Sequence, residues 1–303
     1  AFLPVALCPF HGDRACHSAP VLVINDSAEL ISFRAGSQDQ WILVPTMGAL
    51  HRGHLELIRH ARALADGKGR VAVSIFVNPL QFDRASDLTD YPRQLEEDLE
   101  QCRTTEVDLI FAPDPGSFYA EDHSITVSES LLSKHLCGAT RPGHFDGVCT
   151  VVLKLLNLVR PVSAVFGKKD YQQLAIIRRM VRDLSLDVRI EGVETVREDD
   201  GLALSSRNQR LTPAQRSDAP RIRQALIAAR DLAPCGEQQV ETYLRTARHH
   251  LETGAPDGFA IDYLELVDRE SLQPLPKLNR SALLATACFY GPVRLIDNIE
   301  ITP

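Results

Sequence analysis

Strand-like and helix-like segments alternate along the first two-thirds of the chain, and this alternation restricts the fold more than any other feature of the sequence. Short apolar segments typical of buried strands are separated by longer segments with helical spacing of apolar residues. Parallel strands need crossovers of this length, usually helices. Strands are predicted at 41–45, 70–77, 107–113, 163–167 and 187–198, and helices at 54–66, 91–103, 147–161 and 169–184. We therefore expect an α/β fold with a parallel sheet covered on both faces.

The pattern changes after about residue 196. Two helical segments, at 213–231 and 237–252, precede alternating runs at 259–268, 281–290 and 293–301. Helices followed by closely spaced strands indicate a small α+β domain with an antiparallel sheet. A chain of 303 residues is also longer than one core ordinarily serves. We predict two domains, residues 1–195 and residues 196–303.

The composition argues against several classes of protein. A formal net charge of −7 disfavours nucleic acid as the main partner, because phosphate contacts need a basic face. No apolar run approaches the roughly 20 residues that cross a bilayer. The apolar opening contains Pro4 and has no basic residue before it, which makes a poor signal peptide. We expect a cytoplasmic protein with no membrane or nucleic-acid partner.

The cysteines point to a reducing compartment. There are seven, they are scattered, and they form no C-x-x-C pair, which favours free thiols over a disulfide framework. Four potential metal ligands near the start lack the regular spacing of a zinc finger: Cys8, His11, Cys16 and His17. We favour a terminal tail over a zinc site there and assign it no role.

The first candidate site lies at 44–62, where an apolar strand passes through a loop into an amphipathic helix. Ligands of open α/β sheets collect at such strand ends, and the helix that follows offers unpaired N–H groups to an anion. Gly48 and Gly53 remove side chains where phosphate would approach the backbone. His51 and His54, at i and i+3, can point the same way and donate hydrogen bonds. The alternative is two surface histidines in a loop.

The second candidate, at 166–174, is another strand end followed by a helix. Gly167 permits close backbone approach, Asp170 can accept hydrogen bonds from ribose hydroxyls, and a lysine can balance phosphate charge. Gln172 and Gln173 cannot face the same surface of a helix, so we expect one to face the ligand and the other to face outward. An ordinary helix start with a Lys–Asp pair is the alternative.

The third candidate, at 204–208, places two hydroxyls beside a guanidinium, a compact set of donors for pyrophosphate. A polar linker between domains is the alternative. The dinucleotide fingerprint, the P-loop, the zinc helix H-E-x-x-H and the nucleophile elbow G-x-S-x-G are all absent from the sequence. If the protein binds a nucleotide, the histidines and this serine–arginine segment must therefore contact its phosphates.

Taken together, six stretches in this order closely resemble the pantothenate synthetase (pantoate–β-alanine ligase) family: PTMGALHRGH (45–54), VSIFVNPLQF (73–82), YPR (91–93), RPGHFDGV (141–148), FGKKDYQQL (166–174) and SSRN (205–208). The family belongs to the class I aminoacyl-tRNA synthetase-like nucleotidyl transferases. The resemblance implies a Rossmann-like doubly wound sheet, with the smaller domain closing over the active site. It also implies a homodimer that uses ATP, as its Mg²⁺ complex, with pantoate and β-alanine.

In the implied reaction, the carboxylate of pantoate attacks the α-phosphate of ATP to give pantoyl adenylate and pyrophosphate. The amine of β-alanine then displaces AMP. The residues implied to contact ATP are Met47, Gly48, Ala49, Leu50, His51, Arg52, Gly53, His54, Gly167, Lys168, Lys169, Asp170, Val196, Leu204, Ser205, Ser206 and Arg207.

Within this set, His54 is the implied proton donor with His51 beside it, and Lys169 supplies positive charge. Gln81 and Gln173 are implied to bind pantoate, because its hydroxyls and carboxylate need partners with both donor and acceptor ends. Two further polar positions of the family align with Asn78 and Arg141.

Small departures from the family are Arg52, where an acidic or polar residue is usual, and Leu204, where Met is common. Metal ligands are not assigned, since the acidic run at 96–100 fits a solvated helix face better than a magnesium site. Three alternatives stay open: another nucleotidylyltransferase of the superfamily, a transfer RNA synthetase, which the acidic balance disfavours, and an inactive nucleotide-binding module.

Overall fold

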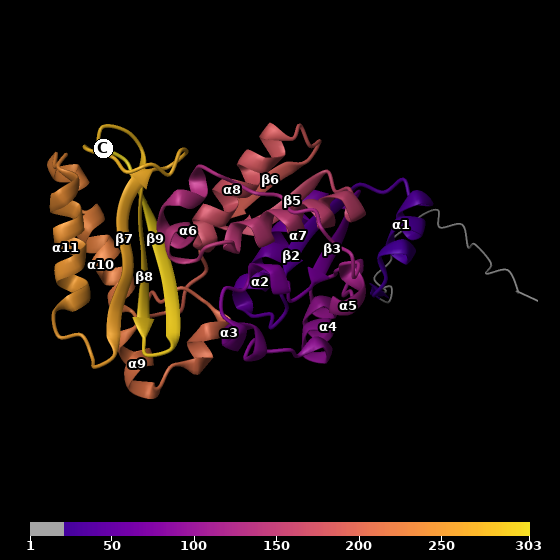
Figure 1. The fold of residues 1–303 in the computed structure, drawn as a ribbon, viewed down its shortest axis with the longest axis horizontal. Coiled ribbons are helices and arrows are strands. Elements are labelled where there is room, and N and C mark those ends of the chain that lie inside the picture. Colours follow the sequence, from indigo (N-terminus) through magenta and orange to yellow (C-terminus); the bar gives the residue numbers. More distant parts are fainter. Residues whose placement is uncertain (1–20) are drawn as a thin grey trace, which may run out of the picture.

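The computed structural model describes residues 21–303, so the Cys/His cluster formed by Cys8, His11, Cys16 and His17 lies outside the described residues. In the described part, a six-stranded parallel sheet is joined to a three-stranded antiparallel sheet (Figure 1). The predicted fold class, a doubly wound α/β part followed by a smaller α+β part, is confirmed. The boundary between residues 195 and 196 stays a prediction.

The parallel sheet has the strand order β1-β4-β3-β2-β5-β6. From β2 the chain builds outward through β3 and β4, then returns to the other side of β2 for β5 and β6. The order therefore reverses between β2 and β5, the position where open α/β sheets bind ligands. The strands are β1 (Leu22–Ile24), β2 (Trp41–Thr46), β3 (Arg70–Ile75), β4 (Leu109–Phe111), β5 (Ser163–Gly167) and β6 (Arg189–Val193).

Helices cover both faces of this sheet because its strands alternate between two buried surfaces. Leu43 of β2 faces one hydrophobic core and Val44 faces the other. The first core is covered by α1 (Ser27–Ala35), α7 (His144–Val159) and α8 (Tyr171–Asp183), and the second by α2 (Arg52–Ala65) and α4 (Leu95–Thr104). Shorter elements connect them: η1 (Pro79–Gln81), α3 (Ala85–Thr89), α5 (Pro115–Phe118), η2 (Leu132–Lys134), α6 (Leu136–Thr140) and η3 (Lys168–Asp170).

The antiparallel sheet is buried on both faces and joins the two parts of the molecule. On one face, Leu284 packs into a core with α10 and α11, which Figure 1 shows on the outer side of this sheet. On the other face, Leu283 and Ala285 belong to the first core of the parallel part. The elements are η4 (Ser206–Arg210), α9 (Pro213–Asp218), α10 (Arg221–Arg230), η5 (Ala233–Cys235), α11 (Val240–Glu252), β7 (Phe259–Asp268), β8 (Ala282–Tyr290) and β9 (Val293–Ile301).

Some predicted boundaries are wrong. The helix predicted at 91–103 begins only at Leu95, because the buried ring of Tyr91 packs on Phe82, 5.7 Å between centroids, before the helix starts. The helix predicted at 213–231 is two helices, broken next to Pro220, which has no N–H to continue the first. The strand β1 and the helix α1 were not predicted, although the apolar run before Asp26 and the capping side chain of Asp26 are local signals for them.

Candidate active site

A cleft opens at the carboxyl ends of β2, β3 and β5, where the strand order reverses. All three candidate segments contribute to it. The predicted residues that line this central cleft are Met47, His51, His54, Gln81, Lys169, Asp170, Gln173, Ser205, Ser206 and Arg207.

The two histidines close the first turn of α2. Nδ1 of His51 accepts a hydrogen bond from the N–H of Gly53 at 3.1 Å, and Nδ1 of His54 accepts one from the N–H of His51 at 3.3 Å. A neutral imidazole that accepts through one nitrogen carries its proton on the other. Both rings therefore hold their proton on Nε2, at the positive end of a helix that favours anions.

Burial keeps both rings neutral near pH 7. It lowers the pKa of His51 from 6.5 to about 4, with the charge of Lys169 as the second cause. Burial, then the neighbouring His51 and Lys169, lowers the pKa of His54 to about 3. Near pH 7 these side chains are therefore hydrogen-bond donors rather than cations.

Gly53 makes room for this arrangement. A Cβ at that position would lie 2.9 Å from Cε1 of His51, closer than non-bonded carbons approach. Arg52, in contrast, points away from the histidines. It donates to the carbonyl oxygen of Arg197 at 3.0 Å and lies 3.7 Å from the carboxylate of Glu198.

A buried carboxylate from α4 fixes the loop before the histidines. Asp98, 1% exposed, accepts hydrogen bonds from the N–H groups of Ala49 (2.9 Å) and Leu50 (2.7 Å). Gly48 has a φ of +78°, and a Cβ there would lie 2.8 Å from Asp98 Oδ2. The loop therefore uses two of its N–H groups within the protein. The expected solvated face at 96–100 is wrong for Asp98, because this side chain is a structural acceptor.

The two lysines after β5 have different surroundings. Lys169 lines the central cleft, and its Nζ lies 3.9 Å from the carboxylate of Asp170. Lys168 instead pairs with Glu194 and lies 3.9 Å from Glu300. Among the described residues, Lys168 is therefore held by carboxylates outside the cleft.

The backbone of this turn is held from the antiparallel sheet. Nδ2 of Asn298, on β9, donates to the carbonyl oxygens of Lys168 (3.0 Å) and Lys169 (2.9 Å). Gly167 leaves open space, since a Cβ there would meet only Leu57, at 4.0 Å.

Ser205 and Arg207 are arranged by η4. Ser205 caps this element, and its Oγ accepts from the N–H of Arg207 at 3.3 Å. The guanidinium of Arg207 donates to Asp87, on α3, at 2.9 Å. The third segment therefore reaches the cleft with its arginine already paired.

Val196 and Leu204 face each other in a short hairpin before this element, where the N–H of Leu204 donates to the carbonyl oxygen of Val196 at 3.0 Å. Arg197 ties the hairpin to β9 through two hydrogen bonds to Asp297, at 2.7 and 2.9 Å. Some predicted ATP contacts are absent from the lining of the central cleft in the described chain: Gly48, Ala49, Leu50, Arg52, Gly53, Gly167, Lys168, Val196 and Leu204.

A chain of hydrogen bonds orients Gln81, which is 9% exposed. Its Oε1 accepts from Nδ2 of Asn78 at 3.0 Å, and Oδ1 of Asn78 accepts from the hydroxyl of Tyr119 at 3.0 Å. Nδ2 of Asn78 also donates to the carbonyl oxygen of Gly147 at 3.0 Å. Asn78 thus uses both ends of its amide within the protein and positions Gln81.

Of the two glutamines of α8, one was predicted to face the ligand and the other to face outward, and only the first part of this prediction agrees with the structure. Gln173 lines the central cleft. Gln172 does not face outward: it is 5% exposed, and its Nε2 donates to the carbonyl oxygens of Leu132 (2.8 Å) and His135 (2.7 Å). The outward direction predicted for the second glutamine is wrong, because the segment at 132–135 covers it.

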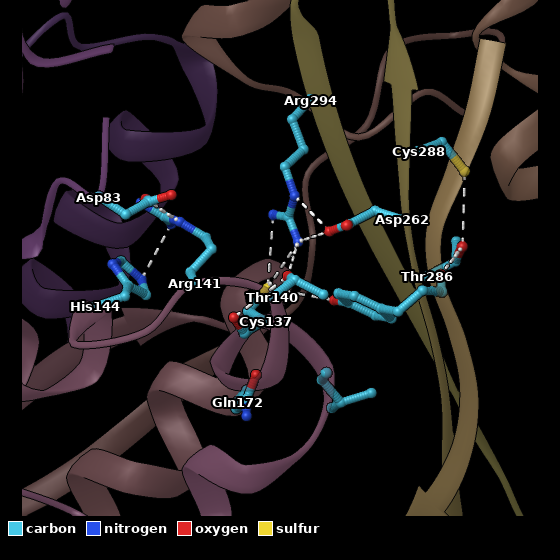
Figure 2. Close-up of polar contacts among 12 residues, drawn as sticks. Asp83, Cys137, Thr140, Arg141, His144, Gln172, Asp262, Thr286, Cys288 and Arg294 are labelled. Atoms are coloured by element: carbon cyan, nitrogen blue, oxygen red, sulfur yellow. Dashed lines mark hydrogen bonds and ion pairs between the residues drawn. The ribbon is translucent and has the colours of Figure 1, made fainter. Parts of the chain in front are cut away.

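Arg141 and His144 form the wall next to Gln81. Figure 2 shows Arg141 between Asp83 and His144; its Nε donates to Asp83 at 2.7 Å, and Nη1 lies 3.3 Å from His144 Nε2. Nδ1 of His144 donates to the carbonyl oxygen of Gln81 at 2.7 Å. Burial, then the charge of Arg141, lowers the pKa of His144 to about 4, so this ring is also neutral.

A second cavity adjoins the central cleft and extends toward the antiparallel sheet. Its far wall carries Arg294, which donates to Asp262 at 2.7 Å and to Thr140 at 3.3 Å (Figure 2). The residues shared by the two cavities are Arg141, His144, Lys169, Asp170, Gln173, Ser205 and Arg207.

The fold and the cleft define a class of protein. Neutral imidazole donors, a lysine and an arginine surround the switch point of a doubly wound parallel sheet, which is the arrangement of a Rossmann-like nucleotide-binding enzyme. None of the helices among the described residues has both the length and the apolar character needed to cross a membrane.

Comparisons with known proteins identify the family. Residues 23–300 match the model of the pantoate–β-alanine ligases. The chain is 56% identical over 263 residues to pantothenate synthetase of Akkermansia muciniphila, covering 87% of this chain and 92% of the relative. It is 47% identical to that of Thermosipho africanus, covering 85% and 91%. The chain therefore belongs to the pantoate–β-alanine ligase family, and the resemblance is confirmed.

Solved structures agree with this assignment. Pantothenate synthetase from Thermus thermophilus superimposes with a TM-score of 0.87 at 44% identity, covering 93% of this chain and all of that chain. The pantoate–β-alanine ligase from Francisella tularensis, complexed with β,γ-ATP and β-alanine, gives 0.75 at 33% identity, covering 92% and 97%. The protein is thus a ligase of the pantoate–β-alanine ligase family.

Proposed function

We propose that the enzyme joins pantoate to β-alanine through a pantoyl adenylate formed in the central cleft. A carboxylate oxygen of pantoate attacks the α-phosphorus of ATP, and the bond to pyrophosphate breaks. The amine of β-alanine then attacks the acyl carbon, loses a proton, and displaces AMP. The observation that carries this proposal is that one cleft contains the histidine pair, Lys169, Arg207 and two glutamines.

Catalysis in this proposal rests on alignment and on charge stabilisation, and needs no enzyme nucleophile. The Nε2–H groups of His51 and His54 donate to phosphate oxygens, with His54 nearest the developing charge. Lys169 and Arg207 balance the negative charge of the triphosphate, and Asp170 accepts from the ribose hydroxyls. The roles of donor, cation and acceptor follow from the chemistry of each group, and the place of His54 nearest the developing charge follows from the family resemblance.

Pantoate lies against Gln81 and Gln173 in this proposal. An amide offers a donor and an acceptor, which suits a ligand with hydroxyls and a carboxylate. Asn78 and Tyr119 would act through Gln81, since their hydrogen bonds fix its orientation. Residues 196–303 would close over the bound substrates, because Asn298 already connects their sheet to the turn that carries Lys169.

Mg²⁺ enters the proposal as part of the ATP complex. Mg²⁺ commonly keeps several waters and binds one or two carboxylates together with phosphate oxygens. The described residues contain no group of three or more His, Cys, Asp or Glu side chains that could hold a metal ion. In this proposal phosphate oxygens and water supply most of its ligands, as is usual for Mg²⁺ bound with a nucleotide.

We also propose a homodimer located in the cytoplasm. Five cysteines in the described part of the chain are free thiols, which suits a reducing compartment: Cys102, Cys137, Cys149, Cys235 and Cys288. The homodimer rests on the family resemblance. Sedimentation of the full chain tests it, and a monomer at micromolar concentration would overturn it.

Isotope transfer tests the adenylate. With ATP and pantoate labelled with ¹⁸O in its carboxylate, we expect one ¹⁸O in the phosphate of AMP when β-alanine is added. Unlabelled AMP, or ADP as the product, would contradict attack on the α-phosphorus. A stable nucleotidyl product that accumulates with β-alanine present would favour a nucleotidylyltransferase, and normal ATP binding without turnover would favour an inactive module.

The pantoate site is tested with Gln81→Ala. We expect a higher KM for pantoate with little change in the Kd of ATP, because the amide of Gln81 is assigned to pantoate and not to ATP in this proposal. Gln224→Ala, at an exposed position of α10, is the control. If Gln81→Ala weakened the binding of pantoate and of ATP equally, this result would count against the assignment of Gln81 to pantoate.

A further inference from the structure

Arg207 lies at the meeting point of the central cleft and the adjoining cavity, and its charge is already balanced. Its Nη2 donates to Oδ2 of Asp87 at 2.9 Å, and both side chains are about three-quarters buried. The same arginine is one of the two cations proposed to hold the triphosphate. A nucleotide must therefore share this guanidinium with a carboxylate or displace it.

Asp87 is held in place by more than one contact. It lies in the first turn of α3, and its Oδ1 is 3.5 Å from Nη1 of Arg210. Arg210 in turn lies 3.4 Å from Asp90, at the end of the same helix. Figure 1 shows α3 next to the antiparallel sheet, where Arg84 lies over the ring of Phe289 at 5.4 Å.

We propose that Asp87 is a positioning residue that holds Arg207 at the cleft in the absence of nucleotide and competes with the triphosphate for its guanidinium. This inference rests on the proposed role of Arg207. Phosphate and carboxylate both accept the planar donors of a guanidinium, so the two anions seek the same group. The carboxylate also repels a triphosphate bound beside it.

The competition sets how readily nucleotide and pyrophosphate leave. With Asp87 present, release of the anion returns Arg207 to an existing partner instead of leaving it unpaired. Removal of the carboxylate takes away this partner and the repulsion together. Both effects favour the bound state, but only the first acts through Arg207, since the repulsion is direct.

The test is the Kd of ATP in the presence of Mg²⁺ and the Kd of inorganic pyrophosphate, measured by calorimetry on the full chain. We expect Asp87→Asn to bind both about two- to fivefold more tightly, the range of a partly exposed ion pair. Asp90→Asn is the matched control, since it removes the same charge from the same helix and contacts Arg210 only. It should leave both values unchanged. Asp87→Ala serves as a second variant, and thermal unfolding shows whether each is folded.

A double-mutant cycle separates this inference from the proposed function. In an Arg207→Ala background, Asp87→Asn should tighten ATP binding less than it does in the parent chain, because only the direct repulsion is left to remove. Equal tightening in the two backgrounds would overturn the competition. If Arg207→Ala weakens ATP binding while Asp87→Asn leaves it unchanged or weaker, only the competition is overturned. If Arg207→Ala has no effect on ATP, the role of Arg207 fails as well. Equal tightening by Asp90→Asn would also overturn the inference, because it would reveal a general charge effect.

Discussion

The N–H of His51 donates to Nδ1 of His54 at 3.3 Å, and the two imidazole rings stack with their centroids 4.1 Å apart. Because Nδ1 of His51 accepts from Gly53, each ring uses one nitrogen to satisfy the start of α2. Each keeps an Nε2–H for a ligand. The helix start and the anion site are thus built from the same two side chains.

The first prediction concerns these donors. His54→Gln should lower kcat/KM for ATP by about 10²- to 10³-fold, the usual cost of removing a preorganised donor to developing charge. Glutamine at this third helical position can still accept from the N–H of His51, as in a capping box, so the unfolding free energy should change little. His60→Gln, on the same helix but outside the lining of the cleft, is the control. A rate loss no larger than that of the control would remove His54 from the mechanism.

The second prediction concerns pH. The pKa of His51 is about 4 in the folded protein against 6.5 ordinarily, so the unfolded chain binds more protons between these values. The free energy of unfolding contributed by this ring should therefore rise with pH from about 4 to 6.5 and be constant above. Urea unfolding between pH 4.5 and 8 measures it. His51→Gln should reduce the slope, to which His54 and His144 also contribute, and an unchanged slope would contradict a neutral buried ring at position 51.

The lowered pKa values of His51 and His54 also predict how kcat/KM for ATP depends on pH. Since His51 and His54 stay neutral until well below pH 6, they should contribute no acid limb near pH 6.5 to kcat/KM for ATP. An acid limb at that pH that disappears in His51→Gln would show that His51 gains its proton near pH 6.5, which would contradict a pKa of about 4.

The third prediction concerns the loop before the histidines. Asp98→Asn keeps one acceptor oxygen but places an N–H donor against a backbone N–H, so either Ala49 or Leu50 loses its partner. A buried donor without a partner costs about 1–3 kcal/mol. We expect this loss in unfolding free energy together with a raised KM for ATP. Glu97→Gln, exposed on the same helix, should change neither.

Sequence patterns predicted the central cleft because the carboxyl ends of parallel strands meet at one edge of a sheet. His51 and Lys169 follow neighbouring strands, so the alternation of elements alone places them near each other. The remaining contacts come from residues far away in the chain. Asp98 and Asn298 had no local signal, since each acts on backbone groups 48 to 130 residues away.

Local periodicity also cannot tell which neighbour covers a polar side chain. The acidic run at 96–100 has the composition of a solvated face, yet Asp98 is buried beneath the loop. Gln172 is likewise buried by a segment that its own helix does not indicate, since that segment lies 37 residues or more earlier in the chain. In both cases the tertiary partner, and not the helix itself, decides the burial.

The fourth prediction separates two adjacent lysines. Lys169 faces the cleft, whereas Lys168 is paired with Glu194 outside it. Lys169→Met should therefore weaken ATP binding and lower kcat/KM by about 10²-fold or more, the scale of a lost charge contact in the transition state. Lys168→Met removes the same charge from the same turn, but it should cost about 1 kcal/mol of stability or less, as expected for a partly exposed pair. Calorimetric ATP binding and steady-state rates on both variants distinguish the two sites. Similar losses in the two variants would mean that net charge near the cleft, and not the position of one ammonium group, governs the reaction.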